Sequence, residues 1–290
     1  MNSPEVSVVI TTYNRTNCIP GALETVLKQS FQDFEIIVVD GARNELNRRA
    51  VKRFQRYDRR IRYVPVEKEA VDYISYKGIQ HSRNVGCKEA KGIYIAMLDD
   101  DDHWHPDKLK KQVKQFHTHL GLGLCLCHTK IGMGKDAIID ATKEFPTYED
   151  LLQSFNLSST SSYLIRRDVL EEIGWWNEEL RGMHEYDLAL KLSKKGYIIY
   201  TIPEPLMYRD RMSNITVESR HYYFIKIAEI FDLWKYYGKD FIPRVGLKGF
   251  VFNVGKTIVL ISLFSLGYIV KERVWKLVYP LKKLHEEVVC

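Results

Sequence analysis

Short apolar runs alternate with amphipathic stretches along the first 120 residues. The runs are rich in β-branched residues, which is typical of strands buried on both faces; they cover residues 6–12, 34–40, 61–66 and 93–98. The stretches between and after them repeat hydrophobic residues every three to four positions, as helices do; they cover about 19–29, 45–57, 79–90 and 106–117. Because strand and helix alternate throughout, we expect an α/β fold with a doubly wound, mostly parallel central sheet.

The rhythm changes after residue 120. Short strands are predicted at 122–128, 137–140, 163–165 and 197–202. Helices are predicted at 147–155, 168–173 and 186–195, the last of them stopped by Gly196. A polar run, Asn156–Ser162, crosses between two of these elements. We expect one catalytic domain over residues 1–215.

Residues 216–290 are expected to form a helical C-terminal extension. The segment 245–270 is largely apolar, but its longest run free of charge is the 14 positions 257–270, and a bilayer span needs about 20. Flanking lysines and Trp275 suit a helix that lies in the membrane interface. We therefore favour peripheral attachment to the membrane, with a helical hairpin packed on the domain and a true span as the alternatives.

The composition is that of an ordinary globular protein, with 45% hydrophobic and 28% charged residues in 290. The formal charge of +6 is mild, and a basic bias in 43–62 and in the last third would suit phosphates or an anionic membrane surface. No recognition helix, zinc finger or RNA-binding signature is present, so nucleic acid is not an expected partner. Five cysteines without a paired framework, and no signal peptide, point to the cytoplasm.

Four consecutive carboxylates, Asp99–Asp102, follow the apolar run at 93–98. Side chains alternate between the two sides of a strand, so Asp99 and Asp101 can share one side. Such a pair offers oxygen ligands to Mn²⁺ or Mg²⁺, which would hold a phosphorylated ligand. The alternative is a solvated turn or helix start, which Pro106 supports because proline suits the first helical turn.

Five segments in order resemble the family 2 inverting glycosyltransferases, which have the GT-A, Rossmann-like fold. They are Val-Ser-Val-Val-Ile-Thr-Thr-Tyr-Asn-Arg at 6–15, Ile-Ile-Val-Val-Asp at 36–40, Ser-Arg-Asn-Val-Gly at 82–86 with Ala90 and Gly92, Leu-Asp-Asp-Asp-Asp-His-Trp-His-Pro-Asp-Lys-Leu at 98–109, and His-Glu-Tyr-Asp-Leu at 184–188. Each segment by itself is weak evidence for the family. The resemblance depends on their shared order and spacing over residues 5–215.

The resemblance implies which residues bind a nucleotide-sugar. The family's donor-binding positions fall on Thr12, Tyr13, Arg15, Asp40, Arg83, Asn84, Asp99 and Asp100. Asp40 would bind the base, although the chain continues Gly-Ala-Arg where the family has a second Asp, Gly and Ser. The alternative for Asp40 is a turn or cap residue.

The resemblance also assigns the metal ligands within the acidic tract. Asp99 and Asp101 align with the Asp-x-Asp pair, with Asp101 as the direct ligand of Mn²⁺ or Mg²⁺ and Asp102 as a lesser candidate. The cation's task in the family is to neutralise charge on the departing nucleoside diphosphate.

The general base is expected at Glu185 or Asp187. The family has Glu-Asp-x-Asp where this chain has His184, Glu185, Tyr186 and Asp187, so the usual aspartate base falls on Glu185. Each residue taken alone could equally be a carboxylate in the first turn of a helix.

The sequence leaves open the roles of two further pairs of residues. Trp175 and Trp176 could stack on a sugar or anchor the core, and Arg209 and Arg211 could close over a diphosphate.

These expectations describe a metal-assisted inverting glycosyltransferase. It would use a nucleotide-diphosphate sugar and a glycan or polyprenyl-linked saccharide acceptor, and would lie peripherally at the inner face of the cell membrane. The alternatives are a catalytically degenerate nucleotide-sugar-binding protein and a nucleotidyltransferase. Thr-Thr-Tyr-Asn-Arg stands where a nucleotidyltransferase usually has a glycine-rich phosphate loop.

Overall fold

The structure is a computed structural model, and it describes residues 3–66, 77–132, 137–153, 157–180, 182–209, 235–237 and 239–240. The chain divides into two compact units, Met1–Ser213 and Asn214–Cys290. The first unit contains every named helix and strand and is described below. Most of the expected C-terminal extension, including the apolar segment 245–270, lies outside the described residues.

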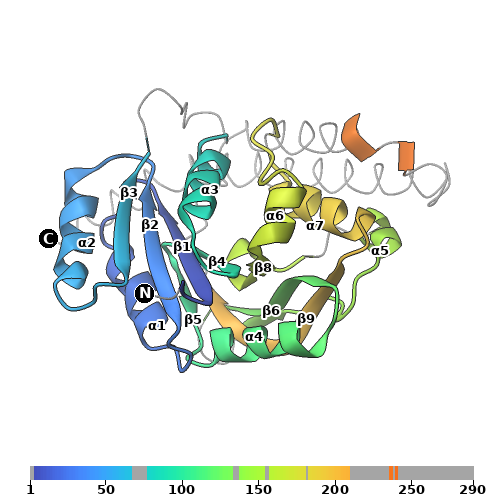
Figure 1. Cartoon of the computed structure of the whole chain (residues 1–290), viewed down its shortest axis with the longest axis horizontal. Helices are drawn as coiled ribbons and strands as arrows, with labels where there is room; N and C mark the ends of the chain where they lie inside the picture. The colour runs from blue at the N-terminus through green and yellow to red at the C-terminus, as the bar shows by residue number, and fades with distance from the viewer. Residues whose placement is uncertain are drawn as a thin grey trace, which may run out of the picture. The chain divides into compact units, whose positions relative to one another are not determined.

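The first unit alternates strands and helices in the expected order (Figure 1). The strands are β1 (Val6–Thr12), β2 (Phe34–Asp40), β3 (Ile61–Pro65), β4 (Tyr94–Asp99), β5 (Asp102–Trp104), β6 (Leu122–Ile131), β7 (Ile138–Asp140), β8 (Leu164–Arg166) and β9 (Ile198–Arg209). The helices are α1 (Ile19–Leu27), α2 (Glu45–Gln55), α3 (Lys77–Glu89), α4 (Lys108–Thr118), α5 (Tyr148–Gln153), α6 (Arg167–Glu172) and α7 (His184–Lys194), with a 3₁₀ turn η3 (Thr160–Ser162).

The strands form one mixed sheet in the order β3-β2-β1-β4-β8-β6-β9-β5, with β7 beside β6. The long pairings β1–β2, β1–β4, β2–β3 and β6–β9 are parallel. The pairings of β4–β8, β5–β9, β6–β7 and β6–β8 are antiparallel and involve only two or three residue pairs each. The predicted α/β class with a mostly parallel sheet is confirmed.

Two details of this sheet were not predicted. β9 is one continuous strand of 12 residues, twice as long as the strand predicted at 197–202. The strands β4, β8, β6, β9 and β5 are joined by hydrogen bonds in that order, and Asp100 and Asp101 connect β4 directly to β5. These five strands therefore form a closed ring, which the acidic tract completes.

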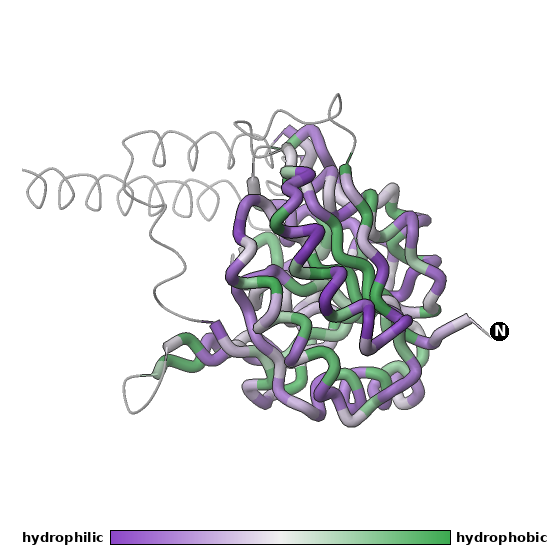
Figure 2. Tube along the Cα trace, turned by 90° about the vertical axis from the view of Figure 1, so that its left-hand side faces the viewer, coloured by the Kyte–Doolittle hydropathy of each residue, from purple (hydrophilic) through white to green (hydrophobic). Residues whose placement is uncertain are grey.

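Helices cover both faces of the sheet. On one face, α1, α2 and α4 share a buried cluster with β1 and β2, whose members include Val8, Ile36 and Leu23. On the other face, α3 approaches β1 and β2 so closely that a Cβ on Gly86 would lie 2.4 Å from Val9 Cγ1 and 2.8 Å from Val39 Cγ2. Hydrophobic residues follow the central strands and polar ones the outer helices (Figure 2).

The buried cysteines are part of this core. Cys125 and Cys127 on β6 are free thiols without solvent exposure. Within the described residues, no helix combines the length and the apolar character that crossing a membrane requires.

Candidate active site

The candidate site lies at the carboxyl ends of β1, β2 and β4. Thr11 on β1 pairs with Asp99 at the end of β4, and Thr12 pairs with Asp40 at the end of β2. Because these strands are parallel, the loops that follow them meet at one edge of the sheet. This is the edge at which α/β folds bind their ligands.

The four carboxylates of the acidic tract alternate in burial. The side chains of Asp100 and Asp102 are 5% and 1% exposed, whereas those of Asp99 and Asp101 are 27% and 18% exposed. This alternation matches the strand periodicity predicted from the sequence. It leaves Asp99 and Asp101 as the pair that solvent can reach.

Asp100 is held by residues that follow β1. Thr12 donates its hydroxyl to Asp100 Oδ2 at 2.6 Å, and Arg15 Nη1 lies 3.3 Å from Asp100 Oδ1. Burial raises the pKa of the Asp100 carboxyl to about 7, although Thr12 and Arg15 counteract part of this effect.

Asp102 is held by residues from two distant segments. Ser161 donates its hydroxyl to Asp102 Oδ2 at 2.6 Å, and Arg209 Nε lies 3.3 Å from Asp102 Oδ1. Burial raises the pKa of the Asp102 carboxyl to about 6, against the lowering effect of Arg209. The Ser161 hydroxyl also accepts the backbone N–H of Asp99 at 2.9 Å, so it fixes the end of β4.

Asp99 and Asp101 each pair with one arginine. Arg83 Nη2 lies 3.2 Å from Asp99 Oδ1, and Arg15 Nη1 lies 2.6 Å from Asp101 Oδ2. The second oxygen of each carboxylate has no partner within the described residues. No group of three or more His, Cys, Asp or Glu side chains there could hold a metal ion by itself. Asp99 and Asp101 together offer two carboxylates, fewer than a complete cation site needs, so their role as metal ligands stays a prediction.

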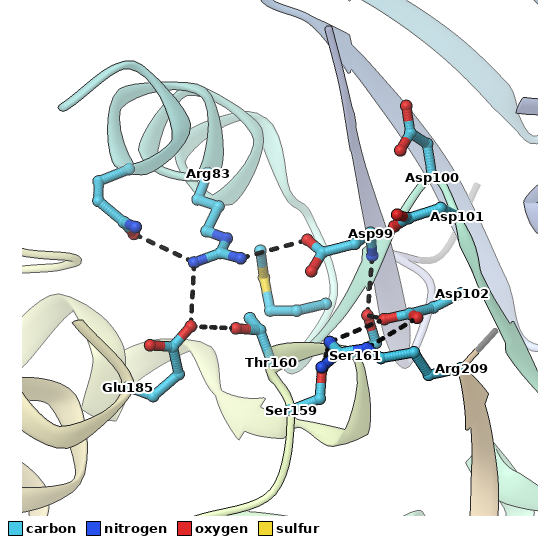
Figure 3. A network of polar contacts seen from close by, with 12 residues as sticks. Arg83, Asp99, Asp100, Asp101, Asp102, Ser159, Thr160, Ser161, Glu185 and Arg209 are labelled. Atoms are coloured by element: carbon cyan, nitrogen blue, oxygen red, sulfur yellow. Dashed lines mark hydrogen bonds and ion pairs between the residues drawn. The ribbon is translucent and has the colours of Figure 1, made fainter. Parts of the chain in front are cut away.

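Arg83 joins the acidic tract to the start of α7 (Figure 3). Its guanidinium contacts Asp99 and, through Nη1, Glu185 Oε1 at 3.4 Å. The side chain is 6% exposed and lies 5.1 Å from the centre of the Trp176 ring. Burial would lower the pKa of the Arg83 guanidinium, but the two carboxylates reverse this effect and raise it.

Glu185 is the carboxylate of α7 that faces this network. Thr160 donates its hydroxyl to Glu185 Oε1, and the Glu185 side chain is 30% exposed. Burial raises the pKa of the Glu185 carboxyl, but the charge of Arg83 and the Thr160 hydroxyl outweigh it, so the pKa is lowered. The ionised, proton-accepting form of the carboxylate is thus favoured, and the side chain is partly exposed.

Asp187 has different surroundings. Its side chain is 2% exposed, and Lys191, one turn further along α7, lies 2.8 Å from Asp187 Oδ2. The geometry therefore favours Glu185 over Asp187 as the base.

Asp40 is engaged by its own turn. Its carboxylate accepts the backbone N–H groups of Ala42 and Asn44 at 3.0 and 2.9 Å, the Asn47 amide at 3.1 Å and the Tyr63 hydroxyl at 2.8 Å. These contacts describe the turn residue that we gave as the alternative. A contact between Asp40 and a nucleotide base stays a prediction.

The side-chain amide of Asn84 is hydrogen-bonded to the loop after α6. Its amide nitrogen donates to the Trp176 carbonyl at 2.9 Å, and its amide oxygen accepts the Trp176 N–H at 3.0 Å. Trp176 is 2% exposed and stacks on Tyr163, so it anchors the core. Asn84 therefore positions this loop. Its contact with the donor stays a prediction.

Three other residues were predicted at the site: Tyr13, Arg209 and Arg211. Tyr13 is 44% exposed beside Thr12 and is open to a ligand. Arg209 lies at the site through Asp102 and the Ser159 hydroxyl, and Arg211 lies outside the described residues.

The sequence did not predict the roles of Ser159, Thr160 and Ser161. We described the polar run Asn156–Ser162 only as a crossing segment. Thr160 and Ser161 are 3% and 0% exposed, and both bond to carboxylates of the site. A run of hydroxyl residues has the composition of a surface loop, so only its burial reveals this role.

Known proteins resemble this chain in sequence. The profile of the family described as "Glycosyl transferase family 2" matches residues 7–174. A glycosyltransferase of Haemophilus influenzae, itself uncharacterized, is 27% identical over 208 residues, which cover 70% of this chain and 67% of the relative. TuaG of Bacillus subtilis, a glycosyltransferase provisionally named for teichuronic acid biosynthesis, is 29% identical over 207 residues, covering 70% and 77%.

Solved structures share the fold. Residues 1–349 of TarS from S. aureus, in complex with UDP-GlcNAc, superpose with a TM-score of 0.60 at 19% identity over 79% of this chain and 66% of that one. The chain covers only 40% of a longer TarS structure. The mannosyltransferase PcManGT from Pyrobaculum calidifontis, in complex with GDP-Man and Mn²⁺, superposes with a TM-score of 0.61 at 17% identity over 98% and 84%.

The profile match spans more than half of the chain. The chain belongs to glycosyl transferase family 2 and has the GT-A fold.

Proposed function

We propose that this protein transfers a sugar from a nucleotide-diphosphate donor to an acceptor hydroxyl, with inversion at the anomeric carbon. The observation that carries the proposal is the contact chain Asp99–Arg83–Glu185. It joins Asp99, a partly exposed carboxylate at the end of β4, to Glu185, a partly exposed carboxylate with a lowered pKa at the start of α7. A donor site and a proton acceptor are thereby held in one network, as a displacement reaction requires.

The donor would bind across the ends of β1 and β4. Tyr13 is exposed there, and Arg15 and Arg83 supply positive charge for a diphosphate. Thr12 and Asp100 would support this surface from beneath, because they are buried against each other. UDP-GlcNAc in TarS and GDP-Man in PcManGT support a nucleotide-sugar as the class of donor.

Asp99 and Asp101 would hold a divalent cation, Mn²⁺ or Mg²⁺, through their unpartnered oxygens. When bound, such an ion would neutralise the negative charge of the diphosphate leaving group. Mn²⁺ accompanies the donor in PcManGT, which supports this assignment.

Glu185 would act as the general base. Its carboxylate would accept the proton of the acceptor hydroxyl as that oxygen attacks the sugar. Arg83 and Thr160 would keep it ionised and fix its orientation. The acceptor would be a glycan or a polyprenyl-linked saccharide, held at the inner face of the cell membrane.

A thermal-shift panel of nucleoside diphosphates, with and without Mn²⁺, tests this proposal. One nucleotide should raise the melting temperature, and Mn²⁺ should increase that shift, because ligands that bind only the folded form stabilise it. Asp101→Asn should remove the increase caused by Mn²⁺. Asp33→Asn, an exposed carboxylate just before β2 and therefore at the opposite end of that strand from Asp40, is the matched control and should keep it.

Two outcomes would count against the proposal. If no nucleotide changes the melting temperature with or without Mn²⁺, the donor site is wrong. If a nucleotide-sugar binds but the wild-type protein never releases its sugar to water or acceptor, the catalytically degenerate alternative is correct. That alternative arises because Glu185 stands where the family has aspartate.

A further inference from the structure

A concentration of positive charge lies on and around α2, away from the acidic tract. Residues 43–60 contain eight basic residues, at 43, 48, 49, 52, 53, 56, 59 and 60, and two acidic ones, at 45 and 58. Removing these from the 43 basic and 37 acidic residues of the chain leaves 35 of each sign. The formal charge of +6 therefore resides entirely in this short segment.

The helix directs its cations away from the domain. Asn47 and Val51 are fully buried, and α2 packs with this side against β2, β3 and α1. At 100° per residue, the four basic residues of the helix and Arg56, its C-cap residue, fall in an arc of about 140° on the other side. All five are exposed; they are Arg48, Arg49, Lys52, Arg53 and Arg56. We call these five residues the cationic face.

Few carboxylates neutralise the cationic face. Glu45 lies 3.4 Å from both Arg48 and Arg49, and these exposed pairs are weak. Within the described part of the chain, Lys52, Arg53 and Arg56 form no ion pair. Arg15 and Arg83 of the candidate site pair with carboxylates, whereas the described part of the chain offers no carboxylate partner to these three cations.

Exposed apolar side chains flank the cationic face. Tyr57, directly after α2, is 91% exposed, and Leu46, in its first turn, is 57% exposed. Lipid headgroups with the acyl boundary beneath them accommodate both cations and such apolar groups. A nucleic-acid backbone would use the cations but not Leu46.

We propose that the cationic face docks the domain onto an anionic lipid surface. α2 lies beside β3, the edge strand of the sheet, so it is placed to meet a flat surface (Figure 1). Each lysine or arginine near an anionic bilayer strengthens binding, and three or more act together. The proposal does not depend on the transfer reaction or on the residues of the site.

Co-sedimentation of the full chain with lipid vesicles tests the proposal. The wild-type protein should bind vesicles containing phosphatidylglycerol more strongly than vesicles of phosphatidylcholine alone. Binding should be lost near 1 M salt, where the Debye length is about 3 Å. The variant Arg49→Glu/Arg53→Glu/Arg56→Glu should lower the partition coefficient on anionic vesicles by on the order of 100-fold.

A matched variant controls for net charge. Lys88→Glu/Lys110→Glu/Lys114→Glu changes the charge by the same amount at exposed positions on α3 and α4. It should lower binding by no more than about tenfold, since those residues lie outside the cationic face. Circular dichroism and the nucleotide-induced thermal shift show that both variants are folded.

Three results would overturn the proposal. The first is wild-type protein that does not prefer anionic vesicles. The second is an α2 variant that binds vesicles as tightly as the wild type, or a control variant whose vesicle binding falls as much as that of the α2 variant. The third is wild-type protein that binds RNA or a soluble polyphosphate through these arginines but does not bind vesicles, which would assign the cationic face to a different polyanion.

Discussion

Glu185 combines accessibility with an environment that keeps it charged. Arg83 and Thr160 both contact its Oε1 atom, and the side chain is still partly exposed. Asp187, two residues later, is buried and paired with Lys191. The two carboxylates belong to one helical turn, yet only one of them faces the candidate site.

Glu185→Gln should lower the turnover number by about 10²- to 10⁴-fold, because glutamine cannot accept the proton. Nucleotide affinity should stay close to that of the wild type, since the substitution preserves shape. Transfer assays with the identified donor, together with nucleotide titrations, measure the two quantities separately. Asp187→Asn separates the candidates: if it abolishes turnover while Glu185→Gln does not, the base has been assigned to the wrong residue.

Thr160→Val should shift the acidic limb of the activity profile to higher pH. The Thr160 hydroxyl stabilises ionised Glu185 and so helps to lower its pKa. Removing the hydroxyl therefore raises the pH at which the carboxylate becomes available. The measurement is kcat/KM as a function of pH; Thr160→Ser, which keeps the hydroxyl, should behave as the wild type. An unchanged acidic limb in Thr160→Val would show that this hydrogen bond does not tune the base.

At the scale of elements, α3 connects packing with the site. Gly86 allows the helix to approach β1 and β2, and Arg83, one turn earlier, then reaches both Asp99 and Glu185. The close approach thus determines where the guanidinium lies.

Gly86→Ala should destabilise the protein by about 1–3 kcal/mol through overpacking. Alanine favours helices by about 1 kcal/mol over glycine, but the new Cβ would lie 2.4 Å from Val9 Cγ1. The check is urea denaturation, with the exposed Lys88→Ala on the same helix as control. A Gly86→Ala protein that is more stable than the wild type would show that β1 and α3 separate easily.

The elements differ in how well the sequence predicted them. Apolar runs such as those of β1, β2 and β4, the first two rich in β-branched residues, identify buried strands by themselves. β5 and β8 have three residues each, too few for any periodicity, and their places depend on partners distant in the chain. The acidic tract and Glu185 were found from sequence because carboxylates at such junctions are conspicuous. Ser161 and Thr160 were missed because their roles come from burial against those carboxylates.

At the scale of the whole molecule, one buried cation couples stability to pH. Lys108, at the start of α4, is fully buried; its Nζ donates to Gln112 at 2.7 Å and lies 4.0 Å from the centre of the Trp104 ring. Burial lowers the pKa of the Lys108 ammonium from 10.5 to about 8. Between pH 8 and 10.5 the unfolded chain therefore binds more protons than the native one, and this residue's contribution to stability rises with pH.

Lys108→Met should remove this contribution. The unfolding free energy of the wild type, minus that of the variant, should rise between pH 8 and 10.5 by at most roughly 3 kcal/mol. Taking this difference cancels other groups that titrate in the same range. Lys110→Met, exposed on the same helix, should give a difference independent of pH. A flat difference for Lys108→Met would mean that water reaches the ammonium.

The five-stranded ring has a consequence for how the protein is made. Asp102 pairs with Arg209, the last residue of β9, and Asp100 and Asp101 are the covalent link that completes the ring. During synthesis on the ribosome, Asp102 emerges about a hundred positions before its partner Arg209. Arg15 and Arg83 precede the acidic tract, so a nascent chain already has the arginines that pair with Asp99, Asp100 and Asp101, but Asp102 lacks its arginine until β9 has been translated. A product terminated earlier lacks both the ring and the arginine that holds Asp102.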